Sequence, residues 1–220
     1  MILFFKRGQH SYPLRIQAAL KDYEQITEEK RHPHVVTQIP VYNEYNVVEK
    51  CIRAAAEMKY PAKKHTIQIL DDSTDETSGL IDEVVAELSK KGKEVYVLRR
   101  NNRIGFKAGA LEQGMEALPA DFYAIFDADF IPPTDFLSRT IPILVARPGV
   151  GLVQARWGHL NTHQHFITRA QGVGIDGHFT IEQSARASNK LFMNFNGTAG
   201  ILRHQAIVEA GGWSHDTLTE

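Results

Sequence analysis

Tyr123-Ala-Ile-Phe-Asp-Ala-Asp-Phe130 carries the strongest signal in this sequence. Its first four residues are apolar, and they predict a buried β-strand over Tyr123–Phe126. Asp127 and Asp129 follow at once, and carboxylates beside apolar residues are costly to bury unless a cation or hydrogen bonds compensate. Mg²⁺ and Mn²⁺ prefer such oxygen ligands and usually complete their shell with phosphates and water. The stretch therefore predicts a strand that ends at a divalent metal site facing a diphosphate.

Short apolar runs alternate with helical segments on both sides of this stretch. The predicted strands are Val35–Ile39, Thr66–Leu70, Glu94–Leu98, Tyr123–Phe126 and Gly151–Gln154. The predicted helices are Leu14–Glu29, Val47–Met58, Ser78–Lys91, Lys107–Leu118 and Thr134–Val145, with an interrupted helical pattern around Ile167–Ser188. This alternation predicts an α/β fold with a wound, Rossmann-like central sheet and helices on both faces. Such sheets bind ligands at the carboxyl ends of their strands.

The domain organisation is simple, because the chain has no linker-like run, repeat or low-complexity tract. We expect residues 1–33 to form a helical lead-in and residues 34–220 to form one domain whose C-terminal part is truncated. After about Arg156 the alternation weakens into a stretch rich in His, Gln, Asn and Gly. One domain with an irregular second half is the simplest interpretation.

Polar motifs follow the first two predicted strands, as ligand binding at strand ends requires. The first strand continues into Pro40-Val-Tyr-Asn-Glu44, in which Glu44 opens the next helix. A carboxylate there is also explained as a partner of the helix dipole. The second strand ends at Asp71 and Asp72, and these carboxylates suit a base N–H or a ribose hydroxyl. Asp75 is interpreted as a cap of the following helix.

A glycine-flanked lysine and two tryptophans add weaker signals. Arg103-Ile-Gly-Phe-Lys107 suits a backbone that passes close to phosphates, although a turn into a helix with a solvated lysine explains it equally well. Trp157 and Trp213 offer flat faces of the kind that stack on sugar rings, or they belong to the core. These alternatives stay open at the level of the sequence.

Two further patterns are interpreted as chance. Gly172-Val-Gly-Ile-Asp-Gly177 matches a dinucleotide-binding pattern, but no strand precedes it. His159, His163 and His165 have no cysteine or carboxylate partner at zinc-ligand spacing, so we expect them in a polar loop.

Composition limits the function classes. The net charge of -1 gives no electrostatic footprint for nucleic acid, and we expect no nucleic-acid partner. The single cysteine, Cys51, fits a reducing compartment. No stretch approaches the ~20 apolar residues of a membrane span. Met1-Ile-Leu-Phe-Phe5 before Lys6 and Arg7 has the wrong order for a signal peptide, and it is either the end of an upstream membrane helix or an arbitrary end of the sequence.

Taken in order, these motifs closely resemble the family 2 glycosyltransferases, especially the cellulose-synthase-like and glucomannan-synthase branch. The matching stretches are Gln38-Ile-Pro-Val-Tyr-Asn-Glu44, Asp71-Asp-Ser-Thr-Asp75, Tyr123-Ala-Ile-Phe-Asp-Ala-Asp-Phe130, His178-Phe-Thr-Ile-Glu-Gln183, Asn194-Phe-Asn-Gly-Thr-Ala-Gly200 and Thr219-Glu220. Each piece alone is weak, but the ordered set is specific.

The resemblance implies a GT-A fold and inverting transfer from UDP-glucose or GDP-mannose to a growing β-linked polysaccharide, with Mg²⁺ or Mn²⁺ as cofactor. It assigns Pro40, Tyr42, Glu44, Asp71, Asp72, Lys107 and Asp127 to the nucleotide-sugar donor, and Asp127 and Asp129 to the metal. It assigns Phe195, Asn196 and Gly197 to the acceptor, and we add Trp157 as a stacking surface. A non-processive transferase acting on a lipid or small acceptor, and a non-catalytic nucleotide-sugar-binding module, are the alternatives. The sequence does not specify the oligomeric state.

One departure concerns the catalytic base. In the family, Thr-Glu is followed by an aspartate that deprotonates the acceptor hydroxyl, whereas this sequence stops at the catalytic candidate Glu220. General-base catalysis typically contributes ~10² to 10⁴-fold, so we expect this chain to bind a donor but to transfer sugar weakly or not at all. The family's membrane helices are also absent. We expect the parent enzyme at the cytoplasmic face of a membrane and this chain to be soluble.

Overall fold

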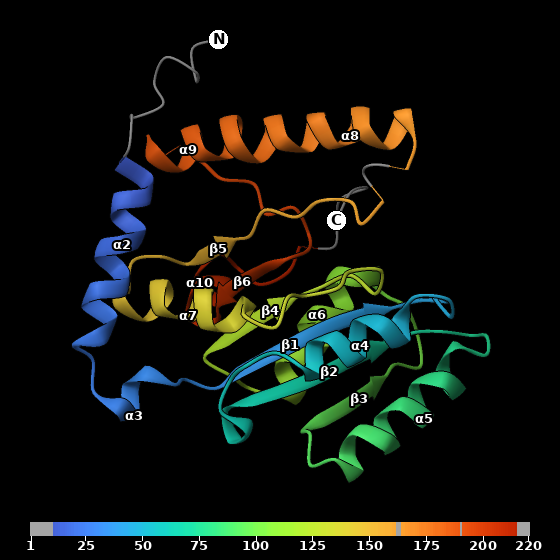
Figure 1. The fold of residues 1–220 in the computed structure, drawn as a ribbon. Coiled ribbons are helices and arrows are strands. Elements are labelled where there is room, and N and C mark those ends of the chain that lie inside the picture. Colours follow the sequence, from blue (N-terminus) through green and yellow to red (C-terminus); the bar gives the residue numbers. More distant parts are fainter. Residues whose placement is uncertain (1–10, 162–163, 190, 215–220) are drawn as a thin grey trace.

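The computed structural model describes residues 11–161, 164–189 and 191–214 (Figure 1). The helical elements are α2 (Ser11–Glu24), α3 (Glu28–Arg31), α4 (Val48–Ala56), η1 (Ala62–Lys64), α5 (Thr77–Lys90), α6 (Phe106–Ala117), α7 (Phe136–Ala146), α8 (Phe166–Asp176), the π-helical η2 (Gly177–Gln183), α9 (Ser184–Ser188) and α10 (His204–Glu209). The strands are β1 (Val35–Val41), β2 (His65–Asp71), β3 (Val95–Arg99), β4 (Phe122–Ile125), β5 (Leu152–Gln154) and β6 (Gly200–Arg203).

The strands form one six-stranded sheet in the order β3-β2-β1-β4-β6-β5. Strands β1 to β4 are parallel, whereas β6 runs antiparallel to its neighbours β4 and β5. All five predicted strands are present, but β6 was not predicted, because its short segment directly joins a helix and has no alternating pattern of its own. Gly200 pairs with Ile125, so β6 begins beside the carboxyl end of β4. This direction brings the residues before β6 to the edge where ligands are expected.

Helices cover both faces of the sheet, which confirms the predicted wound α/β arrangement (Figure 1). On one face, α4, α5 and α7 bury Ile52, Ile81 and Leu137 against the apolar residues of β1, β2 and β4. On the other face, α6 and α10 bury Met115 and Ile207. Burial of each large aliphatic side chain contributes ~1.5 to 3 kcal/mol, so both layers fix the strands and therefore the positions of the strand ends.

The segments at either end of the predicted domain pack onto this core. Helix α2 contacts α7 and α9, and Asp22 forms an ion pair with Arg147. Figure 1 shows α8, η2 and α9 as one helical run beyond the β5 edge of the sheet. The Gly172–Gly177 pattern lies in this helical run and not at a strand–turn–helix junction, as expected. The predicted boundary at residue 34 stays a prediction.

None of the helices in the described part of the chain is long and apolar enough to cross a bilayer.

Candidate functional site

A cleft of about 360 Å³ opens at the carboxyl ends of β1, β2 and β4. Its lining residues are Pro40, Val41, Tyr42, Glu44, Leu70, Asp72, Arg103, Phe106, Lys107, Ala110, Asp127 and Asp129. The fold thereby brings together predicted donor and metal residues from four separate sequence motifs. A larger cavity of about 680 Å³ lies between α2, α7, β5 and α9, and none of the predicted site residues lines it. We therefore place the candidate site in the smaller cleft.

Lys107 and Asp127 meet at the floor of this cleft. The Lys107 ammonium contacts Asp127 Oδ1. Lys107 lies in the first turn of α6, which Gly105 initiates in the left-handed conformation with φ +71°. The backbone amide of Asp127 donates a hydrogen bond of 3.0 Å to Oγ1 of the buried Thr198. Asp127 is therefore held from two sides, by the start of α6 and by the segment before β6.

Negative charge converges on the cleft from β1 and β4. The pKa of Glu44 is raised above its ordinary value, first by burial and then by the charges of Asp129 and Asp127. A cation bound here would relieve this repulsion. Within the described residues, no group of three His, Cys, Asp or Glu side chains could hold a metal alone. Asp127 and Asp129 fit a Mg²⁺ or Mn²⁺ ion that takes its other ligands from phosphates and water.

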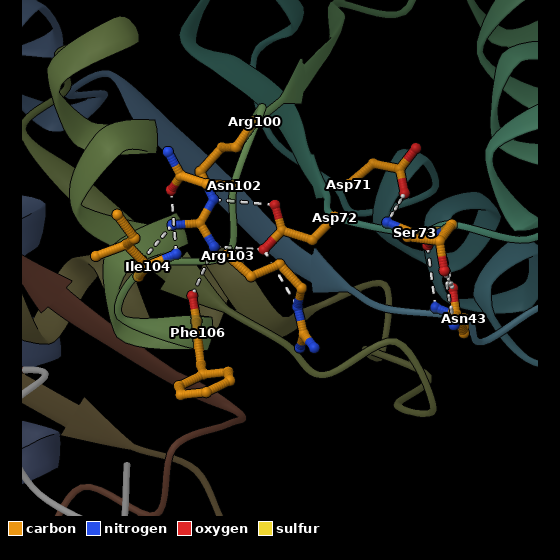
Figure 2. A network of polar contacts seen from close by, with 10 residues as sticks. Asn43, Asp71, Asp72, Ser73, Arg100, Asn102, Arg103, Ile104 and Phe106 are labelled. Atoms are coloured by element: carbon orange, nitrogen blue, oxygen red, sulfur yellow. Dashed lines mark hydrogen bonds and ion pairs between the residues drawn. The ribbon is translucent and has the colours of Figure 1, made fainter.

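Arg100 ties Asp72 to the loop that precedes α6 (Figure 2). Its Nε donates to Asp72 Oδ1 at 2.9 Å, and its Nη2 contacts Oδ2. The same guanidinium donates to the carbonyl oxygens of Ile104 and Phe106, each at 2.9 Å. The Arg100 and Asp72 side chains are only 4% and 6% exposed. Asp72 thus lines the cleft while both of its oxygens hold the loop in place.

Arg103 occupies the wall of the cleft beside Tyr42. Its Cζ lies 3.3 Å from the centroid of the Tyr42 ring and 5.4 Å from that of Phe106. Our sequence reasoning gave no role to Arg103 or Arg100. Both lie within a few residues of the end of the third predicted strand, so the rule that ligand groups follow strand ends would have indicated them.

Asp71 lies outside the lining of the cleft, although it neighbours Asp72 in sequence. Its Oδ1 accepts from the amide of Ser73 at 3.0 Å, and its Oδ2 accepts from Ser78 Oγ and Arg99 Nε at 2.8 Å each. Burial by itself raises the pKa of Asp71, but these hydrogen bonds outweigh it and lower the pKa below its usual value. Asp71 is built into a structural network, and its donor role stays a prediction.

Asp75 accepts a hydrogen bond of 3.0 Å from the backbone amide of Thr77 at the start of α5. The N-cap position of α5 is Glu76, which makes no side-chain capping bond, so Asp75 satisfies the first helical amide from one residue further upstream.

The predicted acceptor residues 195–197 lie next to the cleft, whereas Trp157 packs away from its lining. Gly197 has φ +78°, and a Cβ at this position would lie 3.4 Å from Lys107 Nζ. The Asn196 side chain is within 3.1 Å of the His178 ring, and its backbone amide donates to Gln154.

Two aromatic candidates pack against other rings. The Phe195 ring lies 6.5 Å from that of Trp213. Trp157 makes edge-to-face contacts with Phe130 and Phe179, at centroid distances of 5.5 and 5.7 Å. Trp157 is half-buried and packs against the core, and its acceptor role stays a prediction.

Backbone strain gathers around the same edge of the sheet. In the described part of the chain, the non-glycine residues with positive φ are Asn43 (56°), Phe106 (44°) and Ala199 (51°). Each lies in a segment adjoining the cleft: Asn43 after β1, Phe106 at the first position of α6, and Ala199 before β6. Such conformations cost of order 1 to 3 kcal/mol each and occur preferentially at functional sites.

Glu220 and His163 lie outside the described residues. His165 precedes α8 as its N-terminal cap residue.

Fold and site together define an α/β protein with a cleft at the carboxyl edge of a mostly parallel sheet, lined by carboxylates and a lysine. The chain belongs to glycosyl transferase family 2, whose family model matches residues 38–206. This confirms the resemblance drawn from the motifs.

The curated relatives are longer than this chain. It is 45% identical over 193 residues to glucomannan 4-beta-mannosyltransferase 7 of Arabidopsis thaliana, covering 86% of this chain and 35% of the relative. It is 43% identical over 201 residues to glucomannan 4-beta-mannosyltransferase 1 of Cyamopsis tetragonoloba, covering 90% of this chain and 38% of the relative. The chain thus spans little more than a third of these relatives.

Among solved structures, the chain is similar to the mannosyltransferase PcManGT from Pyrobaculum calidifontis in complex with GDP-Man and Mn²⁺. The TM-score is 0.70 at 19% identity, covering 98% of this chain and 59% of the other. This likeness confirms the predicted GT-A fold.

Proposed function

We propose that this chain carries the donor site of an enzyme that transfers a sugar, with inversion at the anomeric carbon, from a nucleotide-diphosphate sugar to a growing β-linked polysaccharide. The observation that carries the proposal is the gathering of Glu44, Lys107, Asp127 and Asp129 in one cleft of a family 2 chain. The curated relatives are mannosyltransferases, so of the two donors suggested by the sequence we favour GDP-mannose over UDP-glucose. The sheet presents these groups where wound α/β proteins bind their ligands.

Each group has a role that its chemistry supports. Lys107 supplies a point charge for the diphosphate, and Tyr42 offers a ring against which the nucleoside stacks. Asp127 and Asp129 would hold the Mg²⁺ or Mn²⁺, which when bound supplies Lewis-acid stabilisation of the departing diphosphate. Thr198 keeps Asp127 oriented through the hydrogen bond to its amide.

The acceptor is proposed to approach past residues 195–197. Gly197 borders Lys107, and Asn196 is held by His178 and Gln154. An acceptor hydroxyl entering here would reach the same end of the cleft as the metal ligands. The glycosyltransferase domain is proposed to begin at residue 34, with residues 1–33 as a lead-in.

Calorimetric titration with GDP-mannose and UDP-glucose, with and without Mn²⁺, tests the proposed donor site. We expect Mn²⁺-dependent binding of GDP-mannose. Asp129→Asn should weaken it by at least the roughly 10- to 100-fold that is typical even for loss of an outer-shell partner of a metal. Asp82→Asn is the matched control, because the Asp82 side chain is 61% exposed on α5 and does not line the cleft. A folded chain that binds neither donor, or an Asp129→Asn variant that binds as tightly as the wild type, would overturn the proposal.

A further inference from the structure

Arg103 presents hydrogen-bonding capacity to the cleft that its neighbours leave unused. Its Nε is buried and has no hydrogen-bond partner among the described residues. The nearest carboxylate oxygen, Asp72 Oδ2, is 3.9 Å from Nε, which is beyond hydrogen-bond reach. Both Asp72 oxygens are already bound by Arg100. Arg103 therefore lines the cleft as a cation whose charge is paired with Asp72 but whose Nε makes no hydrogen bond among the described residues.

The position of Arg103 is fixed by the groups around it. Its guanidinium stacks on Tyr42 at 3.3 Å and faces Phe106 at 5.4 Å. The surrounding loop is tied down, because Arg100 binds the carbonyl oxygens of Ile104 and Phe106. A cation held this way loses little further conformational entropy when a ligand binds, so its hydrogen bonds contribute more to affinity.

The part of the cleft around Arg103 is also the part that suits a planar ring. Tyr42 and Phe106 supply the aromatic rings in its lining, and they are 40% and 60% exposed. Lys107, Asp127 and Asp129 supply the charges suited to a diphosphate and its metal. A nucleotide that places its phosphates on those charges has its base available for Tyr42, Arg103 and Phe106.

We propose that Arg103 reads the nucleobase of the donor and selects guanine over uracil. The inference rests on the proposed donor site and deepens it. Guanine presents two neighbouring acceptors, O6 and N7, which match the planar fork of a guanidinium. Uracil places an N–H donor beside its O4 acceptor, so the fork meets one acceptor and one opposing donor. A site built to donate two hydrogen bonds rejects a base that accepts only one.

Titration of the 220-residue chain with GDP, UDP and inorganic pyrophosphate, each with Mn²⁺, tests this inference. We expect the wild type to bind GDP more tightly than UDP. Arg103→Ala should weaken GDP binding by roughly 5- to 150-fold, the equivalent of one bidentate contact to a base, and should weaken UDP binding less. Pyrophosphate binding should stay unchanged, because it has no base. Arg103→Lys keeps the charge but loses the fork, so it should also lower the preference for GDP.

Arg139→Ala is the matched control, since its side chain is 77% exposed on α7. Equal losses for GDP and UDP, a wild type that prefers UDP, or unchanged GDP binding by Arg103→Ala would overturn the role of Arg103 and leave the donor site standing. A parallel loss of pyrophosphate binding would show that Arg103 only shapes the cleft, and would also overturn the inference. A folded wild type that binds none of the three would overturn the proposed donor site itself, and this inference with it.

Discussion

Replacing Arg100 with alanine would break the buried ion pair on which the loop before α6 depends. Arg100 is the shared donor to Asp72 and to the carbonyl oxygens of Ile104 and Phe106 (Figure 2). Its removal leaves the Asp72 carboxylate without its main partner and releases the loop that carries Arg103. Both the stability of the chain and the shape of the cleft should respond.

The magnitude follows from the burial of the pair. The side chains of Arg100 and Asp72 are only 4% and 6% exposed, so water cannot replace the missing partner without rearrangement. Removal of one partner from a buried pair costs ~3 to 5 kcal/mol. The free energy of unfolding of a whole domain is only ~5 to 15 kcal/mol, so Arg100→Ala should remove a large part of the stability of this chain. Arg139→Ala, in an exposed pair with Asp135, should stay within ~0.5 kcal/mol of the wild type.

Urea denaturation followed by circular dichroism measures both free energies of unfolding. A double variant, Arg100→Met with Asp72→Leu, separates the two effects of the pair. Because hydrophobic replacement of a whole buried pair is often neutral or stabilising, the double variant should recover stability over Arg100→Ala. It should not recover GDP binding, since nothing then holds the loop carbonyls and the predicted donor residue Asp72 is also replaced.

Two results would refute this reasoning. An Arg100→Ala variant within about 1 kcal/mol of the wild type would mean that the pair is not desolvated as the structure shows. A double variant no more stable than the single one would mean that an unpaired Asp72 is not the source of the cost.

The remaining predictions concern packing and pH. Gly114→Ala should lower the free energy of unfolding by ~1 to 3 kcal/mol, because its Cβ would lie 2.5 Å from Gln38 Nε2 in the packed layer under α6. Gly79→Ala, whose Cβ would meet nothing within 4 Å in α5, should instead stabilise the chain by ~0.5 to 1 kcal/mol. If urea titrations showed that both variants change the free energy of unfolding in the same direction, this account would be contradicted. Burial, followed by the charge of Lys93, lowers the pKa of His65 from 6.5 to about 4, so the unfolded chain binds a proton there that the folded chain does not. Stability should therefore fall as pH drops from 6.5 towards 4, by about 2 kcal/mol between pH 7 and pH 5. In His65→Gln, the loss of stability between pH 7 and pH 5 should be smaller by that amount. If the free energy of unfolding of this variant fell with pH as steeply as that of the wild type, His65 would not be the cause of the loss.

Much of the fold was predictable because its signals are local. The apolar runs that became β1, β2 and β4 end in Pro40–Glu44, Asp71–Asp72 and Asp127–Asp129. Parallel strands place their carboxyl ends at one edge, so periodicity alone implied that these motifs meet. The cleft contains most of the predicted donor and metal residues for that reason.

The rest depends on contacts between residues distant in sequence. No local pattern marks β6, and its antiparallel direction, which carries Thr198 to Asp127, follows from its pairing with β4. Adjacent residues also separate: Asp71 turns into a buried network while Asp72 lines the cleft, because successive residues at the end of a strand point to opposite sides. The sequence by itself determined the strands, their carboxyl-edge motifs and the family. Only the tertiary structure decided which charges pair and where Arg103 lies, since pairing and burial are properties of the packed chain.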